Sequence, residues 1–226
     1  ENVAWPVRCS RSTTCTPTSP DGIVKAVNGV SLERKENSIL GLVGESGSGK
    51  TTTALSVLRL LPFPGETVRG HIWYENRDLL QLEQEAMRQI RGREIALIFQ
   101  DAGSALNPVI TIGRQVEEIM LAHTDMSNRQ ATARAVELLS EMGIPDAKQV
   151  LGRYPFQLSG GMAQRVMLAI GVALGPRVLI ADEPTSNLDV TLQAEILQRL
   201  KLLRDERQTT ILLITHSLER GLDACD

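Results

Sequence analysis

The sequence predicts an α/β fold built on a parallel sheet and interrupted by a helical insertion. Residues 39–43 form a short apolar run that leads into a glycine cluster, and residues 51–61 then have helical character. Apolar strand candidates at 94–99, 178–181 and 210–214 are joined by helical segments, which include 160–174 and 190–204. This alternation of strand and helix is typical of a parallel sheet that is buried on both faces.

The middle of the chain has a different pattern. Between residues 113 and 151 apolar side chains recur at helical spacing, and Gly143 and Pro145 then provide a stop signal. We therefore predict a helical subdomain at residues 101–155, inserted between two core segments at 23–100 and 156–226.

The first 22 residues are rich in Ser, Thr, Pro and Cys and show neither alternation nor a helical period. This composition predicts an irregular N-terminal segment at residues 1–22, with ordered structure beginning near Ile23.

The composition of the chain argues against several classes of function. A net charge of -3 offers no basic excess for phosphate contacts, which argues against a nucleic-acid partner. No apolar run approaches the roughly 20 residues that span a bilayer, and the N-terminus lacks a secretory signal pattern, so we expect any membrane role to come through a partner. The three cysteines support neither a disulfide framework nor a zinc site, which favours a reducing cytosol.

Residues 44–51 match the phosphate-loop pattern G-x-x-x-x-G-K-[ST] between a predicted strand and a predicted helix. Glycines let backbone N–H groups turn toward a phosphate, and the helix N-terminus adds partial positive charge. Lys50 is expected to reach the β- and γ-phosphates, and the Thr51 hydroxyl to bind Mg²⁺. The alternative is a glycine-rich turn with a solvated lysine. The predicted nucleotide contacts are Gly44, Glu45, Ser46, Gly47, Ser48, Gly49, Lys50, Thr51 and Thr52.

Asp182 and Glu183 end the apolar run 178–181, at the edge where a parallel sheet presents groups to a ligand. Asp182 can hold Mg²⁺, and Glu183 can polarise an attacking water. Acids at this position also often cap the following helix, so the signal depends on the phosphate loop.

Further motifs surround these acids. Residues 158–165 read Leu-Ser-Gly-Gly-Met-Ala-Gln-Arg, residues 186–189 read Ser-Asn-Leu-Asp, and His216 follows the last strand candidate. With the phosphate loop, these motifs make the chain resemble the ATPases of ABC (ATP-binding cassette) transporters from about Ile23 onward. The resemblance implies a P-loop NTPase with a parallel-sheet core, an N-terminal antiparallel β portion and an inserted helical subdomain.

The resemblance also implies residue roles. Ser159, Gly160 and Gly161 would contact the γ-phosphate bound to a second subunit, as befits a helix start with bare N–H groups. Gln100 would touch Mg²⁺ or the attacking water, and His216 would hold the γ-phosphate. The implied catalytic residues are Glu183, His216, Gln100 and Lys50, and the implied metal ligands are Thr51, Gln100 and Asp182.

Several of these residues have simpler interpretations. Ser159 and Asp189 can each be an N-cap of the helix that follows, and Asp189 would by resemblance also lie in a loop at the dimer interface. An isolated Gln or His is more often an ordinary surface residue.

Residues 100–108, together with Tyr154 to Gln157, resemble the oligopeptide, dipeptide and nickel importer branch. This implies ATP and Mg²⁺ as cofactors, a second ABC subunit in a homo- or heterodimer, and integral membrane permease subunits. An extracytoplasmic substrate-binding protein would act indirectly. The expected location is peripheral, on the cytoplasmic face of the cell membrane.

The chain departs from the family at both ends. Members place an aromatic residue before the phosphate loop to stack on adenine, but no aromatic lies between Trp5 and Phe63. Trp5 could stack only if the N-terminal segment folded back; otherwise it is an exposed tryptophan. The sequence ends at Asp226, soon after His216, where the branch continues, so we also consider a truncated or altered product.

Three functions follow. The first is an ATP-hydrolysing importer subunit for peptides or nickel. The second is a soluble, non-transport ABC ATPase, which would usually carry a second cassette, a coiled coil or basic segments. The third is a truncated product that binds nucleotide with little turnover.

Overall fold

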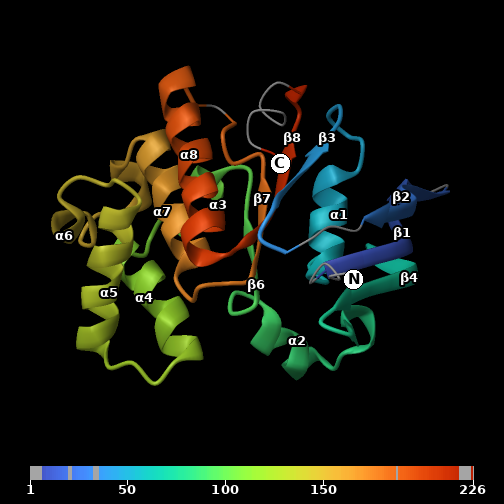
Figure 1. The fold of residues 1–226 in the computed structure, drawn as a ribbon, viewed down its shortest axis with the longest axis horizontal. Helices are drawn as coiled ribbons and strands as arrows, with labels where there is room; N and C mark the ends of the chain where they lie inside the picture. The colour runs from blue at the N-terminus through green and yellow to red at the C-terminus, as the bar shows by residue number, and fades with distance from the viewer. Residues whose placement is uncertain (1–6, 20–21, 33–35, 187, 219–224, 226) are drawn as a thin grey trace.

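In the described part of the chain, two four-stranded sheets and a group of helices make up the fold (Figure 1). The structure is a computed structural model and describes residues 7–19, 22–32, 36–186, 188–218 and 225. One sheet, ordered β3-β8-β7-β6, is parallel, and the other, ordered β2-β1-β4-β5, is antiparallel. The predicted α/β class, parallel core and antiparallel β portion are confirmed.

The parallel sheet is the buried centre of the molecule. Its strands are β3 (Ile39–Val43), β6 (Ile95–Ile98), β7 (Val178–Asp182) and β8 (Thr210–Thr215). Every residue of β7 and β8 is buried. Val43 pairs with Thr215, and Asp182 pairs with Ile214. Because these strands end in register, the loops that follow them emerge together at one edge of the sheet.

The antiparallel sheet corrects the prediction for the N-terminus. Its strands are β1 (Val7–Ser19), β2 (Gly22–Leu32), β4 (Glu66–Tyr74) and β5 (Arg77–Asp78). The prediction of an irregular segment at 1–22 is wrong for residues 7–19. Polar β1 is a strand because β2 pairs with one side of it and β4 with the other, and tertiary pairing overrides weak local alternation. Trp5 lies outside the described residues.

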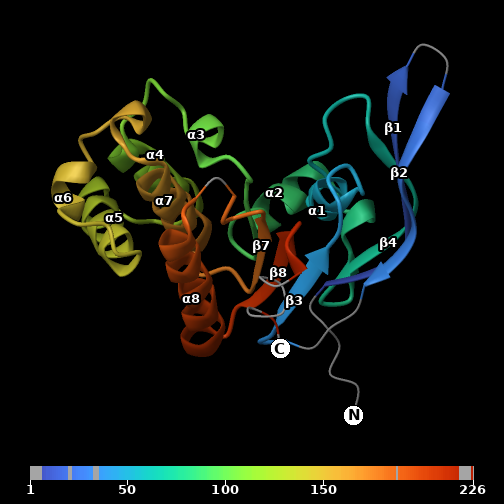
Figure 2. The same cartoon turned by 90° about the horizontal axis from the view of Figure 1, so that it is seen from above.

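The helices gather mainly around the parallel sheet. They are α1 (Lys50–Val57), α2 (Gln84–Ile90), α3 (Ala102–Ala105), α4 (Ile112–His123), α5 (Asn128–Glu141), α6 (Ala147–Val150), α7 (Gly160–Val172) and α8 (Val190–Arg207), with single 3₁₀ turns η1 (Leu79–Gln81) and η2 (Pro155–Gln157). Helices α3 to α6 fall within the predicted insert at 101–155, whose exact limits stay a prediction. Both views place α4, α5 and α6 across the parallel sheet from the antiparallel sheet (Figure 2).

Helix α1 ends earlier than predicted. We expected a helix over 51–61, but it stops at Val57 because Arg59 adopts a left-handed conformation with φ of 53°. The Leu60 N–H then bonds to the Leu55 carbonyl at 2.8 Å, and the Arg59 N–H bonds to the Ser56 carbonyl at 3.1 Å. This is a Schellman termination, which usually uses glycine at the left-handed position. With arginine there, no local pattern marks the end of the helix.

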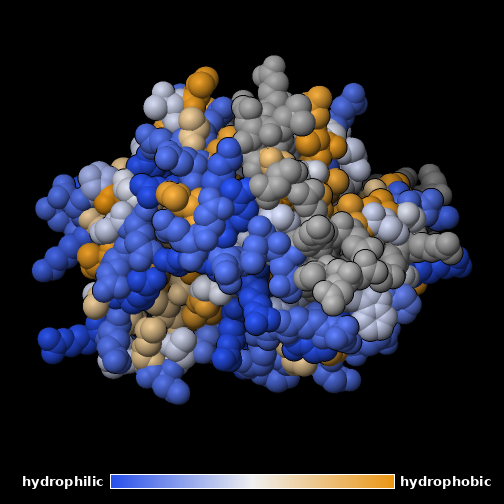
Figure 3. Space-filling view, viewed as in Figure 1, coloured by the Kyte–Doolittle hydropathy of each residue, from blue (hydrophilic) through white to orange (hydrophobic). Residues whose placement is uncertain are grey.

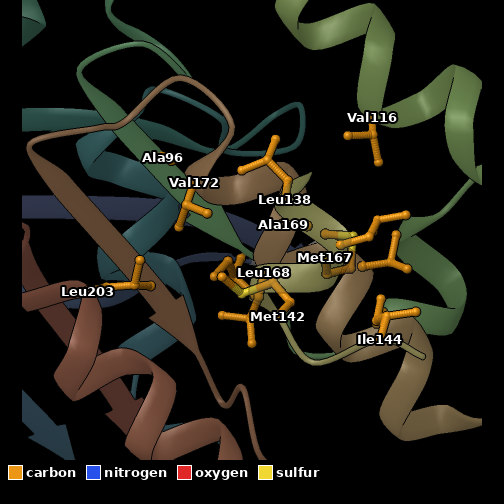
Figure 4. Close-up of a cluster of buried hydrophobic side chains, with 14 of the residues drawn as sticks. Ala96, Val116, Leu138, Met142, Ile144, Met167, Leu168, Ala169, Val172 and Leu203 are labelled. Carbon is orange, nitrogen blue, oxygen red and sulfur yellow. The ribbon is translucent and has the colours of Figure 1, made fainter. Parts of the chain in front are cut away.

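Alternate residues of the central strands enter two hydrophobic clusters. Leu179 and Ala181 join a large cluster, whereas Val178 and Ile180 face a second one beneath α1 and α2. The large cluster runs from the sheet across α7 into the insert, as the packing of Met167 and Leu168 with Leu138 and Met142 illustrates (Figure 4). The insert and the core therefore share one continuous interior.

The exterior seen in Figure 3 is predominantly hydrophilic, with apolar side chains scattered in small groups. In the described part of the chain, no helix has both the length and the apolar character needed to cross a membrane.

Two leucines of α8 provide a matched test of this core. Leu200 is fully buried, whereas Leu202 on the same helix is 36% exposed. We expect Leu200→Ala to lower the free energy of unfolding by about 2–5 kcal/mol, because it leaves a cavity in the large cluster. Leu202→Ala should cost about 1 kcal/mol or less. Urea denaturation of both variants measures the difference, and equal losses would contradict the assignment of the two faces.

Candidate functional site

The turn between β3 and α1 has the backbone shape of a phosphate loop. Gly47 and Gly49 have φ values of 79° and 91°, in the left-handed region that side chains disfavour. A Cβ at Gly49 would also lie 2.5 Å from the Ala26 carbonyl oxygen, so β2 packs against the turn too closely for any other residue. Gly49 is the N-cap of α1 and leads the main chain directly into the helix. The first N–H groups of α1 therefore face the turn.

Lys50 lies along this turn. Its Nζ donates to the carbonyl oxygens of Gly44 at 2.8 Å and Glu45 at 2.7 Å, and the residue is only 8% exposed. The ammonium is therefore held beside the N-terminus of α1, so two sources of positive charge lie together. An anion such as phosphate is the natural partner of this arrangement.

Asp182 ends β7 at the same edge. Burial raises the pKa of its carboxyl group, the nearby charge of Glu183 adds to this, and a hydrogen bond with Thr51 acts in the opposite direction. Its Oδ1 atom is buried and has no hydrogen-bond partner among the described residues. A buried carboxylate oxygen without a partner is costly, which is typical of a site that binds a cation.

Glu183 follows in a strained conformation, with φ of 46°. Its backbone N–H bonds to the Ile214 carbonyl at 2.9 Å, so β8 fixes the main chain at this point. The Oε2 atom of its carboxylate accepts from Gln100 Nε2 at 3.0 Å and lies 3.3 Å from His216 Nδ1. Because a carboxylate oxygen only accepts, a hydrogen bond between these two atoms requires a proton on His216 Nδ1.

These side chains line a pocket of about 280 Å³. The lining residues are Ala26, Ser46, Gly47, Gly49, Lys50, Thr51, Thr52, Gln100, Glu183 and His216. All but Ala26 were predicted as site residues. Ala26, on β2, carried no motif and was missed. Gly44, Glu45 and Ser48 belong to the turn without lining the pocket, and Asp182 does not line it but shares a hydrogen bond with Thr51, which does.

The remaining predicted contacts lie apart from the pocket. Ser159 caps α7 by accepting from the Met162 N–H at 3.3 Å. A Cβ at Gly161 would lie 2.7 Å from Leu192 Cδ1, whereas one at Gly160 would meet nothing within 4 Å. Gly161 therefore lies close to the Leu192 side chain of α8, and Gly160 faces open space.

Asp189 is the N-cap of α8, accepting from the Leu192 N–H at 3.0 Å. The cap interpretation of this residue is confirmed, and a second role at a dimer interface stays a prediction.

A larger cavity, of about 320 Å³, lies beside β4. Its lining is Arg59, Leu61, Gly65, Glu66, Thr67, Val68, Arg69, Gly70, Leu80 and Gln81. Arg59 already donates to the Leu82 carbonyl, and the cavity contains none of the predicted site residues. Size alone therefore does not identify the functional pocket.

The oxygen donors near Lys50 fit Mg²⁺. Thr51 has a hydroxyl, Asp182 has the buried Oδ1 atom, and Gln100, which lines the pocket, has an amide oxygen that would be available to a metal ion. Hard oxygen ligands, with only one or two carboxylates, are what Mg²⁺ uses beside a substrate phosphate.

Comparison with known proteins agrees with this geometry. The sequence profile described as "ABC transporter" matches residues 27–186. The chain belongs to the ABC transporter family. This match covers the phosphate loop, the α7 N-terminus and the acids that end β7.

Curated ABC relatives point to one branch. A putative peptide import ATP-binding protein of Brucella abortus is 49% identical over 87% of this chain and 59% of its own length. The probable D,D-dipeptide transport ATP-binding protein DdpD of Escherichia coli is 46% identical over 91% of this chain and 63% of its own. The predicted resemblance to peptide importers is confirmed, and the chain spans about three-fifths of the length of these relatives.

The fold is shared with ABC cassettes of known structure. The ATP-binding cassette MJ0796, solved as a dimer in a post-hydrolysis state bound to ADP and Pi, superposes with a TM-score of 0.85. It is 28% identical, with 95% of this chain and 90% of that chain covered.

The raised pKa of Asp182 yields a stability prediction. A carboxyl group whose pKa is higher in the folded state opposes folding once it is ionised, and this penalty fades as the pH falls toward the carboxyl range. Asp182→Asn should therefore raise the free energy of unfolding at pH 7, and the gain should shrink at acid pH. Urea denaturation at several pH values measures this, with exposed Asp125→Asn as the control. A gain independent of pH would contradict the explanation.

Proposed function

We propose that this chain is the ATP-binding and ATP-hydrolysing subunit of an ABC importer for peptides. The observation that carries the proposal is the convergence of Lys50, Glu183, Gln100 and His216 on one pocket at the edge of the parallel sheet. Family membership and the peptide-import relatives support it, and those relatives favour peptides over nickel.

The turn and the start of α1 would bind the triphosphate. Backbone N–H groups and the Lys50 ammonium would neutralise the β- and γ-phosphates once Lys50 exchanged its carbonyl partners for phosphate oxygens. Thr51, Asp182 and Gln100 would hold Mg²⁺, which when bound neutralises phosphate charge. Ala26 and the glycines form a wall without bulky side chains, so the backbone can approach the phosphates closely.

Hydrolysis requires a water aligned with the γ-phosphorus. Glu183 Oε2 already accepts hydrogen bonds from Gln100 and His216. The other carboxylate oxygen, Oε1, would therefore accept a hydrogen of the attacking water. The water oxygen would bond to the γ-phosphorus as the bond to the β–γ bridging oxygen breaks, yielding ADP and phosphate. His216 and Gln100 keep Glu183 in one orientation, which is the positioning that this reaction chiefly needs.

The site also implies partners. Ser159 and the open Gly160 lie at the start of α7, outside the pocket, where a second ABC subunit could present its nucleotide. The structurally similar cassette was solved as a dimer. We propose a homo- or heterodimer on the cytoplasmic face of the membrane, attached to integral membrane permease subunits and served indirectly by an extracytoplasmic substrate-binding protein.

Lys50→Ala tests the catalytic assignment. We expect Mg²⁺-dependent ATPase activity to fall by about 10²-fold or more, because the variant lacks the cation beside the phosphate turn. Phosphate release at saturating ATP is the measurement. Lys148→Ala, at an exposed position on α6, is the matched control and should retain full activity. Equal rates in both variants would contradict ATP hydrolysis at this site.

Glu183→Gln tests the pairing of two subunits. The amide keeps the size of the side chain but cannot act as a base, so turnover should fall by about 10²-fold or more while ATP binding persists. Unhydrolysed ATP should then hold two copies together, which light scattering coupled to size-exclusion chromatography detects as a doubled mass. Exposed Glu118→Gln should behave as the unmodified chain does. A Glu183→Gln variant that binds ATP and stays monomeric would exclude a homodimer.

A further inference from the structure

Ser186 is a polar residue beside the pocket that the proposed mechanism does not use. Its Oγ atom donates to the Gln100 carbonyl oxygen at 3.0 Å, across 86 positions of sequence. Its backbone N–H donates to the Glu183 carbonyl at 3.0 Å. The residue is therefore attached to both Gln100 and Glu183.

These contacts close a ring. Gln100 Nε2 donates to the Glu183 carboxylate at 3.0 Å, and Ser186 joins the main chains of the same two residues. Each member is thus fixed by the other two, and hydrogen bonds linked in this way restrain one another more than isolated ones.

The main chain at Gln100 needs such a restraint. Strand β6 is the edge of the parallel sheet, and its pairing with β7 ends at Ile98 and Ala181. Gln100 lies two residues beyond that last pair, where none of the described strands pairs with its backbone. The Ser186 hydroxyl supplies a fixed point there, just before the chain enters α3.

We infer that Ser186 is a positioning residue for ATP hydrolysis, acting through Gln100 on the orientation of Glu183. The inference rests on the proposed function and adds a residue to it. Ser186 does not line the pocket, so its loss should leave nucleotide binding unchanged and slow only the chemical step. The helix cap nearby is a separate feature, because α8 is capped by Asp189.

The test compares Ser186→Ala with Ser186→Thr, which keeps the hydroxyl. We expect Ser186→Ala to lower kcat by about 3- to 10-fold, the effect of losing one neutral hydrogen bond, with KM for ATP unchanged. Ser186→Thr should restore most of kcat. Ser140→Ala, which removes a similar hydroxyl-to-carbonyl bond at an exposed position of α5, should have no effect. Thermal melting of all variants shows whether each is folded.

A second arm asks whether Ser186 acts through Gln100. In a Gln100→Ala background, adding Ser186→Ala should cause little further loss, because the group that Ser186 positions is gone. The inference would be overturned if the loss of kcat in the double variant equalled the product of the two single losses. It would also be overturned if Ser186→Ala kept the kcat of the unmodified chain, or if Ser186→Thr had a kcat as low as that of Ser186→Ala.

Failure of the Ser186 inference can be distinguished experimentally from failure of the proposed function. If the unmodified chain had no Lys50-dependent ATPase activity, both proposals would be overturned. If the unmodified chain were active and the Ser186 variants indistinguishable from it, only the role of Ser186 would be overturned.

Discussion

In-register parallel pairing of β3, β8 and β7 is the constraint on which the site depends. Val43 opposes Thr215, and Asp182 opposes Ile214, so three strands release their chains at one edge. The phosphate turn follows the first strand, His216 the second and Glu183 the third. A shift of one residue in any pair would displace one group by about 3.3 Å and turn its strand over. Burial of alternate residues in two separate clusters prevents such a shift.

Several residues of the site lower the stability of the fold. Asp182 is buried with an oxygen that no described residue contacts by a hydrogen bond, Glu183 has a positive φ, and Lys50 is nearly buried. The unpartnered Asp182 oxygen and the positive φ of Glu183 cost free energy, and a bound cation would offset the cost at Asp182. The surrounding apolar interior offsets these costs. The residues that weaken the fold are thus the residues that the proposed reaction needs.

Sequence patterns predicted the site better than its surroundings. The phosphate turn and the strand-end acids carry strong local signals, because glycines and a lysine at that spacing, between an apolar run and a helix, are typical of one kind of turn. Strand β1 was missed because its serines and threonines form no alternating pattern, although threonine itself favours strands. The end of α1 was missed because Arg59 occupies a position usually taken by glycine. The pairing that makes β1 a strand also involves β4, which is distant in the sequence.

Residues whose place in the site depends on tertiary contacts were the least predictable. Ala26 lines the pocket only because β2 packs against the turn, and nothing in its own sequence context indicates a ligand. Ser186 stood within a recognised motif, but its hydrogen bond to Gln100 joins segments 86 positions apart. Such pairings follow from topology, which a single sequence specifies only indirectly.

Helix α7 connects the parallel sheet with the insert. A Cβ at Gly171 would lie 3.0 Å from Ile98 Cγ1, so α7 packs tightly on β6, and the other side of α7 shares the large cluster with α4 and α5. Close-packed interiors do not deform smoothly, so α7 holds the insert against β6. Gln100 lies between β6 and α3, at the point where the insert joins the core. A displacement at this junction would reach Glu183 through the Gln100 side chain, and the Ser186 hydroxyl would resist it.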